Sequence, residues 1–425
     1  MLLDQATAEQ LKAWESELAE QYNAILGKNL SLDVTRGKPS ADQLSLSDGM
    51  DGILNGNYKA SDGTDTRNYG GLDGIAEAKR LGSDLMGVPS SNIVVGGNSS
   101  LTLMHQTMMT AYHFGLTGPD SAWKNAEQPK VICPVPGYDR HYTVCEQLGI
   151  DMVTVPMTAN GPDMQAAEEL IKNDSSIRGM WCVPKYSNPT GVVYSDETVE
   201  RIAKLGQIAH ADFRVFWDNA YAVHDLVENP PQLASVFELT AKHGTEHSVI
   251  QFASTSKITF AGAGVAFTAA STENLAGLKK FLGASTIGPD KVNQLRHAQF
   301  LPNRDALIKH MKKHAALLQP RFDAVLSALG TAFDGTDLGN WEAPVGGYFV
   351  SFDTRPGCAK ATVKLAAEAG VKLTPAGATF PYGDDPENRN IRIAPSVPSI
   401  EEVVGAMEVF VVCVKLASVR QALAG

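Results

Sequence analysis

The sequence predicts an α/β fold: a large domain with a mostly parallel sheet flanked by helices, plus a smaller α+β domain built from both ends of the chain. From about residue 70 short apolar runs alternate with helical patterns, and after about residue 305 a long charged helix leads into mixed segments. Strand, helix, strand at this spacing is typical of parallel sheets. We expect an N-terminal helix and arm at 1–50, a large α/β domain at 51–305 and a small C-terminal α+β domain at 306–425.

The individual elements follow from the hydrophobic pattern in chain order. Residues 7–26 are expected to form a helix, because Thr7 and Gln10 fit a capping box and apolar residues recur at helical spacing. Gly37 and Pro39 then break the pattern. Further helices are expected at 163–172, 196–210, 304–329 and 399–417. Strands are expected at 92–97, 130–137, 179–184, 213–220, 248–254 and 264–270.

Composition narrows the class of protein. The chain has 425 residues, of which 44% are hydrophobic and 20% charged, enough for a sizeable core and too many for one small domain. A net charge of −11 argues against a nucleic-acid partner, which needs a basic stripe. The five cysteines are scattered, without metal-ligand spacing, so we expect reduced thiols and no metal.

The chain shows no targeting or membrane signal. Its start lacks a basic segment followed by a long apolar one, and no uncharged apolar run reaches about 18 residues. We therefore expect a cytoplasmic protein with no membrane partner.

Polar side chains follow the expected strands, where ligands bind in α/β sheets. Because the carboxyl ends of parallel strands meet at one edge, we expect these side chains to form one site. The residues at these ends are Gly97, Asn98, Ser99 and Ser100, then Tyr138, Asn188, Asp218 and Tyr221, and finally Ser254, Ser256 and Lys257.

Each residue type suits a chemical task, although a structural reading stays open for most of them. Lys257 in "FASTSKITFAGAG" follows a buried strand, and burial lowers an amine's pKa toward the neutral, nucleophilic form. Taken alone it could equally extend its amine from the strand to solvent. Asp218 could be a helix N-cap, and Asn188 a turn residue before proline. The Gly97–Ser100 stretch opens a helical run, and a helix N-terminus favours an anion.

Taken together, the motifs resemble a known family. "SNPTG", "DNAY" and "STSK" occur in that order, with "NYGGLDG", "PVGGYF" and "NRNIRIAP" around them. The chain is similar over nearly its whole length to the fold-type I, pyridoxal-phosphate-dependent aminotransferases of class I/II. Its "VTRGKPS" start resembles a bacterial aspartate aminotransferase subgroup. The resemblance implies pyridoxal 5′-phosphate as cofactor, a seven-stranded sheet in the large domain, and a homodimer with its site at the subunit interface.

The resemblance also implies roles for the residues that match the motifs. Lys257 forms the Schiff base with the cofactor and moves the proton during catalysis. Asp218 keeps the pyridine nitrogen protonated, and Tyr138 stacks on the ring. Tyr221 and Asn188 donate hydrogen bonds to the 3′-oxygen. His141 lies where some relatives place a histidine that bonds the aspartate, although it could also be a histidine satisfied on a helix face.

The phosphate is expected to lie against Gly97, Asn98 and Ser99, with hydroxyls from Ser254 and Ser256. Tyr69 resembles the residue that reaches the phosphate of the neighbouring subunit's cofactor. The chain departs from the family at Gly264, near the place of an arginine that clamps the phosphate in most relatives. Lys291 and Arg296 are possible substitutes for that arginine.

An amino acid substrate needs a cation for its α-carboxylate, and the arginine fork matches that group. Arg392, in an apolar strand pattern, is implied as this residue, with a structural salt bridge as the alternative. Gly37 brings a backbone amide close to the same carboxylate. Arg140, Arg36 and Lys38 are candidates for the second carboxylate of a dicarboxylic substrate.

These observations predict a ping-pong transaminase that acts on aspartate or glutamate and 2-oxoglutarate or oxaloacetate. The alternatives on the same fold are a β-eliminating carbon–sulfur lyase and a transaminase for aromatic amino acids or alanine. A transcriptional regulator built on a transaminase-like domain is disfavoured. Fewer than about 70 residues precede "NYGGLDG", and they indicate one helix and a loop rather than a basic DNA-binding domain.

Overall fold

A computed structural model describes residues 1–424. The α-helices are α1 (Ala8–Leu26), α2 (Ala41–Ser45), α3 (Ala76–Met86), α4 (Ser100–His113), α5 (Asp139–Leu148), α6 (Met164–Asn173), α7 (Asp196–Lys204), α8 (Val236–His243), α9 (Thr272–Ser285), α10 (Lys291–Phe300), α11 (Arg304–Phe333), α12 (Ala359–Glu368) and α13 (Ile400–Ala424). The strands are β1 (Leu32–Asp33), β2 (Ile93–Val95), β3 (Lys130–Val135), β4 (Asp151–Thr158), β5 (Gly161–Pro162), β6 (Ile177–Cys182), β7 (Arg214–Asp218), β8 (Val249–Ser254), β9 (Ala266–Ala269), β10 (Gly339–Trp341), β11 (Val350–Thr354), β12 (Val371–Lys372) and β13 (Asn390–Ile393).

The largest element of the fold is a sheet with the strand order β2-β9-β8-β7-β6-β3-β4-β5. The five central neighbours, β8-β7-β6-β3-β4, pair in parallel. Strand β9 pairs antiparallel with β8, β2 with β9, and β5 with β4. This confirms the α/β prediction. Seven strands were expected in this sheet, and the two-residue strand β5 adds an eighth at one edge.

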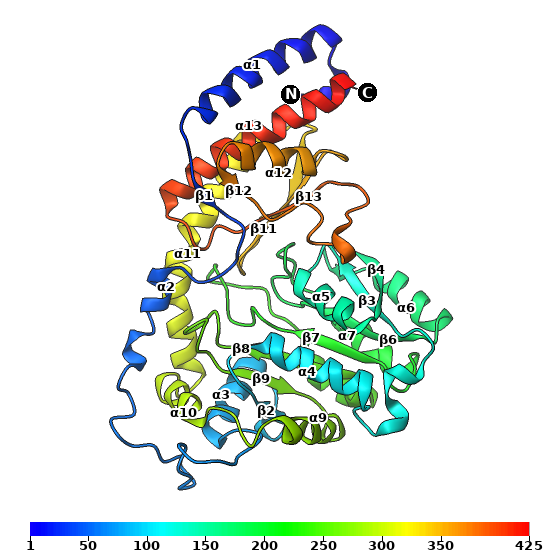
Figure 1. The fold of residues 1–425 in the computed structure, drawn as a ribbon, viewed down its shortest axis with the longest axis vertical. Coiled ribbons are helices and arrows are strands. Elements are labelled where there is room, and N and C mark those ends of the chain that lie inside the picture. Colours follow the sequence, from blue (N-terminus) through cyan, green and yellow to red (C-terminus); the bar gives the residue numbers. More distant parts are fainter. Residues whose placement is uncertain (425) are drawn as a thin grey trace.

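Helices cover both faces of this large sheet (Figure 1). Alternate residues of β3 show why the strand is apolar from residue 131 to 135. Val131 and Cys133 pack in one core with α4 and α9, whereas Ile132 packs in the other with α6 and α7. Successive strand residues point to opposite faces, so a strand buried on both sides cannot alternate polar and apolar residues.

A smaller antiparallel sheet, β10-β11-β13, lies beside the large one, and β1 pairs with β12. Its hydrophobic core joins residues 3–34 to residues 322–419. In Figure 1, α1 runs alongside α13, and both chain ends lie at the top of the view. Residues from both ends of the chain therefore share one core, while the boundaries at 50 and 305 stay a prediction.

The expected elements are present, with shifted ends. The Thr7–Gln10 capping box forms at α1, and all six expected strands occur. Five of them are shorter than expected, and β6 keeps its length but begins two residues earlier, at Ile177. The last helix, α13, continues to Ala424 rather than ending at 417. Strand β4 was not predicted because it is half-exposed, with a proline inside, and lacks the apolar run of its neighbours. No helix within residues 1–424 is long and apolar enough to cross a membrane.

Candidate active site

A cavity of about 770 Å³ opens at the carboxyl ends of the large sheet's strands, between them and the small sheet. Most of the predicted site residues line it. They are Arg36, Gly37, Lys38, Ser99, Ser100, Tyr138, Arg140, Asn188, Asp218, Tyr221, Ser254, Ser256, Lys257 and Arg392. The topology thus brings together residues spread over more than 350 positions of sequence.

Lys257 lies in the turn that follows β8 and borders the cavity. Its amine lies 5.1 Å from the centre of the Tyr221 ring. The protein packed around the amine lowers the pKa of Lys257 below its ordinary value, and the charge of Asp218 opposes this. Burial therefore favours the neutral amine that nucleophilic attack and proton abstraction require.

Asp218 ends β7 and is buried at the base of the cavity. Its Oδ2 lies 3.0 Å from Nε2 of His141, whose ring stacks on Trp181 at 4.0 Å between centroids. Within residues 1–424, Asp218 Oδ1 has no hydrogen-bond partner. A buried carboxylate oxygen without a hydrogen-bond donor lowers the stability of the fold, so this atom is suited to accept a hydrogen bond from an N–H or O–H group of a ligand.

The loop before α4 forms another wall of the cavity. Ser99 caps α4 by accepting a hydrogen bond from Thr102 N at 3.4 Å. Gly97 and Asn98 are exposed and stand outside the cavity lining, where Asn98 O accepts a hydrogen bond from Ser256 Oγ at 3.0 Å. The helix N-terminus and the hydroxyls of Ser254 and Ser256 therefore face one region, as anion binding requires.

Gly264 packs against the turn that carries Lys257. A Cβ there would lie 3.0 Å from Ser256 N, so a larger side chain would displace this turn. Of the proposed substitutes for the family's arginine, Lys291 donates to the carbonyls of Asn68 and Gly70, at 2.8 and 2.6 Å. Arg296 lies 3.4 Å from Asp51, and neither cation lines the cavity.

Tyr69 does not reach the cavity of its own chain. Its side chain is 83% exposed, on the loop that Lys291 holds through the flanking carbonyls. The ring is therefore free to contact another molecule.

Arg392, on β13, points into the cavity from the small sheet and is only 8% exposed. Its Nη1 lies 3.2 Å from Asp139 Oδ1 and 3.2 Å from Asn188 Oδ1. The guanidinium also lies over the Phe349 ring, at 4.8 Å. Asp139 was not singled out from the sequence, although it directly follows the stacking candidate Tyr138.

Gly37 also lines the cavity, and the position has no room for a side chain, because a Cβ there would lie 2.3 Å from Phe349 Cζ. Arg36, Lys38 and Arg140 are exposed where they line the cavity. Lys372 joins them as a fourth exposed cation that the sequence did not indicate. Within residues 1–424, no group of three or more His, Cys, Asp or Glu side chains could hold a metal ion.

Comparison with known proteins agrees with this fold. Residues 6–425 match the family model described as aspartate amino-transferase. A curated aspartate aminotransferase of Corynebacterium glutamicum is 43% identical over 412 residues, covering 97% of this chain and 95% of that protein.

Solved structures extend the comparison. The crystal structure of an aspartate transaminase from C. glutamicum superposes with a TM-score of 0.94 at 42% identity, covering 99% of both chains. An α-aminoadipate aminotransferase from Thermus thermophilus, complexed with N-(5′-phosphopyridoxyl)-L-leucine, shares the fold with a TM-score of 0.74 at 21% identity, covering 95% of each chain. With a family match along almost its entire length and relatives above 40% identity, this chain belongs to the aspartate aminotransferase family and is an aminotransferase.

Proposed function

We propose that this enzyme holds pyridoxal 5′-phosphate in the cavity and transfers an amino group from aspartate or glutamate to 2-oxoglutarate or oxaloacetate. The observation that carries the proposal is the pairing of two groups in one cavity. Lys257 offers an amine whose pKa is lowered by burial, and Asp218 offers a buried, unpaired carboxylate oxygen within the described residues.

The residues present fit this cofactor. Asp218 Oδ1 suits a protonated pyridine nitrogen, and the bond from His141 orients the carboxylate. Tyr138 can cover a flat ring, while the start of α4 suits a phosphate. Tyr221 and Asn188 are buried polar groups at the same cavity. When bound, the cofactor supplies an electron sink for the pair of electrons left at Cα.

Lys257 performs the proton transfer in this proposal. The neutral amine accepts the proton from the substrate's Cα and returns it to the cofactor. The burial that lowers the pKa of Lys257 shifts the amine toward the unprotonated form.

Arg392 binds the α-carboxylate, with its guanidinium oriented by Asn188 and Phe349. A second carboxylate needs a second cation, and Arg36, Lys38 and Arg140 line the same cavity. These cations, with the aspartate aminotransferase of C. glutamicum as a relative, support aspartate or glutamate as donor.

The proposed working form is a homodimer in the cytoplasm. The exposed ring of Tyr69 supports a contact in which each copy contributes this tyrosine to its partner's phosphate site. All five cysteines are unpaired and buried, which suits a reducing compartment.

The test supplies purified protein with pyridoxal 5′-phosphate and, one at a time and without an oxo acid, four donors: aspartate, glutamate, phenylalanine and alanine. Transfer is read from the absorbance change to the pyridoxamine form. Aspartate and glutamate are expected to react fastest. Rapid transfer from phenylalanine or alanine alone would overturn the assignment of aspartate or glutamate as the donor. Release of pyruvate together with ammonia from a single substrate would indicate lyase chemistry.

Lys257→Ala is expected to lower turnover by at least about a thousandfold, because both the covalent link and the proton carrier are removed. The matched control is Lys204→Ala on the surface of α7, where the exposed lysine pairs with Glu200. Turnover that survives Lys257→Ala would refute the assignment.

A further inference from the structure

A cluster of buried polar side chains lies beneath the turn that carries Lys257. Nε2 atoms of His310 and His314, both on α11, lie 2.7 and 2.9 Å from the carbonyl oxygen of Ile258. The carbonyl oxygen of Lys257 accepts from His224 Nε2 at 3.2 Å and from the Tyr348 hydroxyl at 3.5 Å. All four side chains are at most 5% exposed.

Gln43 connects this cluster to the N-terminal arm. Ser40 N donates to Gln43 Oε1 at 3.1 Å, in the capping box of α2, and this contact fixes which end of the amide faces the cluster. The Gln43 Nε2 group then donates to His314 Nδ1 at 3.1 Å and to the Tyr348 hydroxyl oxygen at 3.0 Å.

The direction of these bonds determines the state of His314. Because Nδ1 accepts from Gln43, the ring proton of the neutral histidine is on Nε2, where it donates to the Ile258 carbonyl. Burial also lowers the pKa of His314 to about 4 and that of His224 to about 3, so both rings are neutral near pH 7. The hydrogen bonds therefore all donate in one direction, from Gln43 in the arm to His314 and from His314 to the Ile258 carbonyl in the turn.

Two capping boxes in this chain show that Gln43 does more than cap a helix. In α1, Thr7 N donates to Gln10 Oε1 at 2.8 Å, and Gln10 is exposed. In α2, the equivalent Gln43 is 0% exposed, and its amide nitrogen is bonded to the cluster. A side chain buried with both ends bonded holds its neighbours in one arrangement.

We propose that Gln43 is a positioning residue, which acts through His314 and Tyr348 to hold the turn that carries Lys257. This inference rests on the proposed role of Lys257. It ties the placement of the amine to three separate segments: the N-terminal arm at α2, the long helix α11, and the residues before β11.

The test compares Gln43→Met with Gln10→Met, because each removes one capping-box oxygen and only the first removes the amide that faces the cluster. Both variants are loaded with pyridoxal 5′-phosphate. Four quantities are measured: the dissociation constant of the cofactor, the pH midpoint of its visible absorbance, and kcat and KM for the best donor. Melting temperatures monitor the loss of the cap.

Gln43→Met is expected to shift the absorbance midpoint by about half a pH unit or more and to lower kcat about tenfold, with a smaller change in KM. Gln10→Met is expected to change only the melting temperature. Equal midpoints and equal kcat in the two variants would overturn the inference and leave the proposed function intact. A wild-type protein that binds no cofactor would instead overturn the proposed function.

Tyr348→Phe keeps the inference testable if Gln43→Met does not fold. It removes only the hydroxyl that links Gln43 to the Lys257 carbonyl. The same direction of midpoint shift is expected, with a smaller amplitude. An unchanged midpoint in a folded Tyr348→Phe variant would refute the Tyr348 branch and, with it, the proposal as stated.

Discussion

At the scale of single residues, Arg392 and Asp139 form the contact that most directly concerns substrate binding. The side chain of Arg392 is 9% exposed and that of Asp139 is 35% exposed, with 3.2 Å between Nη1 and Oδ1. In the proposed function, a substrate's α-carboxylate needs donors of the same guanidinium. Asp139 therefore competes with the substrate for Arg392 and adds a negative charge near an incoming anion.

Asp139→Asn is expected to lower KM for every amino acid donor about fivefold, which corresponds to about 1 kcal/mol for a partly exposed ion pair. The value of kcat should change little. Asp139 also begins α5, where an acid near the helix N-terminus is worth about 0.5 kcal/mol, so a slight loss of thermal stability should accompany the change. Steady-state kinetics with two donors measure the effect.

Arg392→Lys serves as the opposite control, since it removes the guanidinium fork that we propose binds the substrate's carboxylate, and it should raise KM. If Asp139→Asn raised KM as well, Asp139 would be orienting Arg392 rather than competing for it.

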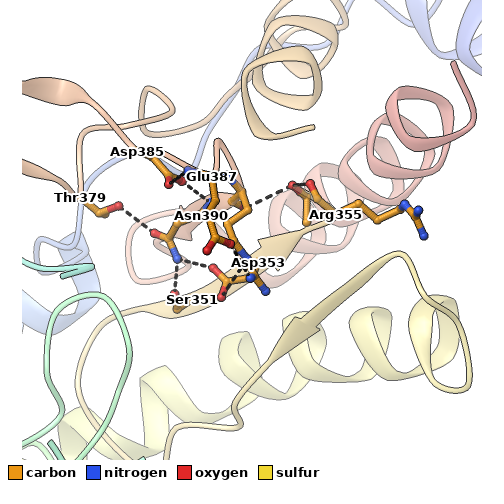
Figure 2. A network of polar contacts seen from close by, with 9 residues as sticks. Ser351, Asp353, Arg355, Thr379, Asp385, Glu387 and Asn390 are labelled. Atoms are coloured by element: carbon orange, nitrogen blue, oxygen red, sulfur yellow. Dashed lines mark hydrogen bonds and ion pairs between the residues drawn. The ribbon is translucent and has the colours of Figure 1, made fainter. Parts of the chain in front are cut away.

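At the scale of elements, the start of β13 is fixed by a buried polar network (Figure 2). Asp385 is 4% exposed, and its carboxylate accepts from the backbone N–H groups of Glu387, Arg389 and Asn390 at 2.8–3.0 Å. The Asn390 amide in turn bonds Thr379, Ser351 and Asp353. Because residues i and i+2 of a strand share a face, this network sets the side from which Arg392 enters the cavity.

Asp385→Ala is expected to destabilise the protein by about 2 kcal/mol, because it leaves backbone donors without a partner. It should also raise KM for amino acid donors by displacing Arg392. Urea unfolding followed by circular dichroism, together with KM, provides the two measurements. The neighbouring Asp384→Ala is the matched control, since Asp384 is exposed. Equal unfolding midpoints for the two variants would contradict the role of the network.

The difference between what sequence could and could not predict follows from how far apart the partners are. Lys257, Asp218 and Asn188 belong to short motifs at strand ends, and parallel strands bring those ends to one edge. Gln43 and His314 are 271 positions apart, and no local pattern records their contact. Lys372 is on β12, which pairs with β1, and it lines the cavity through the arrangement of the two ends of the chain.

At the scale of the whole molecule, buried histidines make stability depend on pH. Burial lowers the pKa of His224 to about 3, and of His297 and His314 to about 4, from an unfolded value of 6.5. Below pH 6.5 the unfolded chain binds protons that the folded chain does not, so acid favours unfolding. Their stabilisation is therefore complete above pH 6.5 and is lost as the pH falls toward 4.

Carboxylates lose their stabilising contribution in a lower pH range. The side-chain hydrogen bond from Lys130, the largest of several, lowers the pKa of Asp174 to about 2 from 3.8, so its contribution is lost only below about pH 4. Between pH 6.5 and 5 the histidines consequently dominate. From pH 7.5 to 5.5 each is expected to lower the free energy of unfolding by about 1.4 kcal/mol, or about 4 kcal/mol for the three together.

His297 offers the clearest test of this pH dependence. Its Nε2 lies 2.8 Å from the Thr259 hydroxyl and its Nδ1 2.8 Å from the Asn293 carbonyl, away from the cavity lining. His297→Asn should lower stability at pH 7.5 through lost contacts, yet flatten the decline between pH 7.5 and 5.5 by about 1.4 kcal/mol. Urea midpoints at the two pH values measure both effects. A variant that declines as steeply as the wild type would show that His297 is protonated in the folded protein over this range.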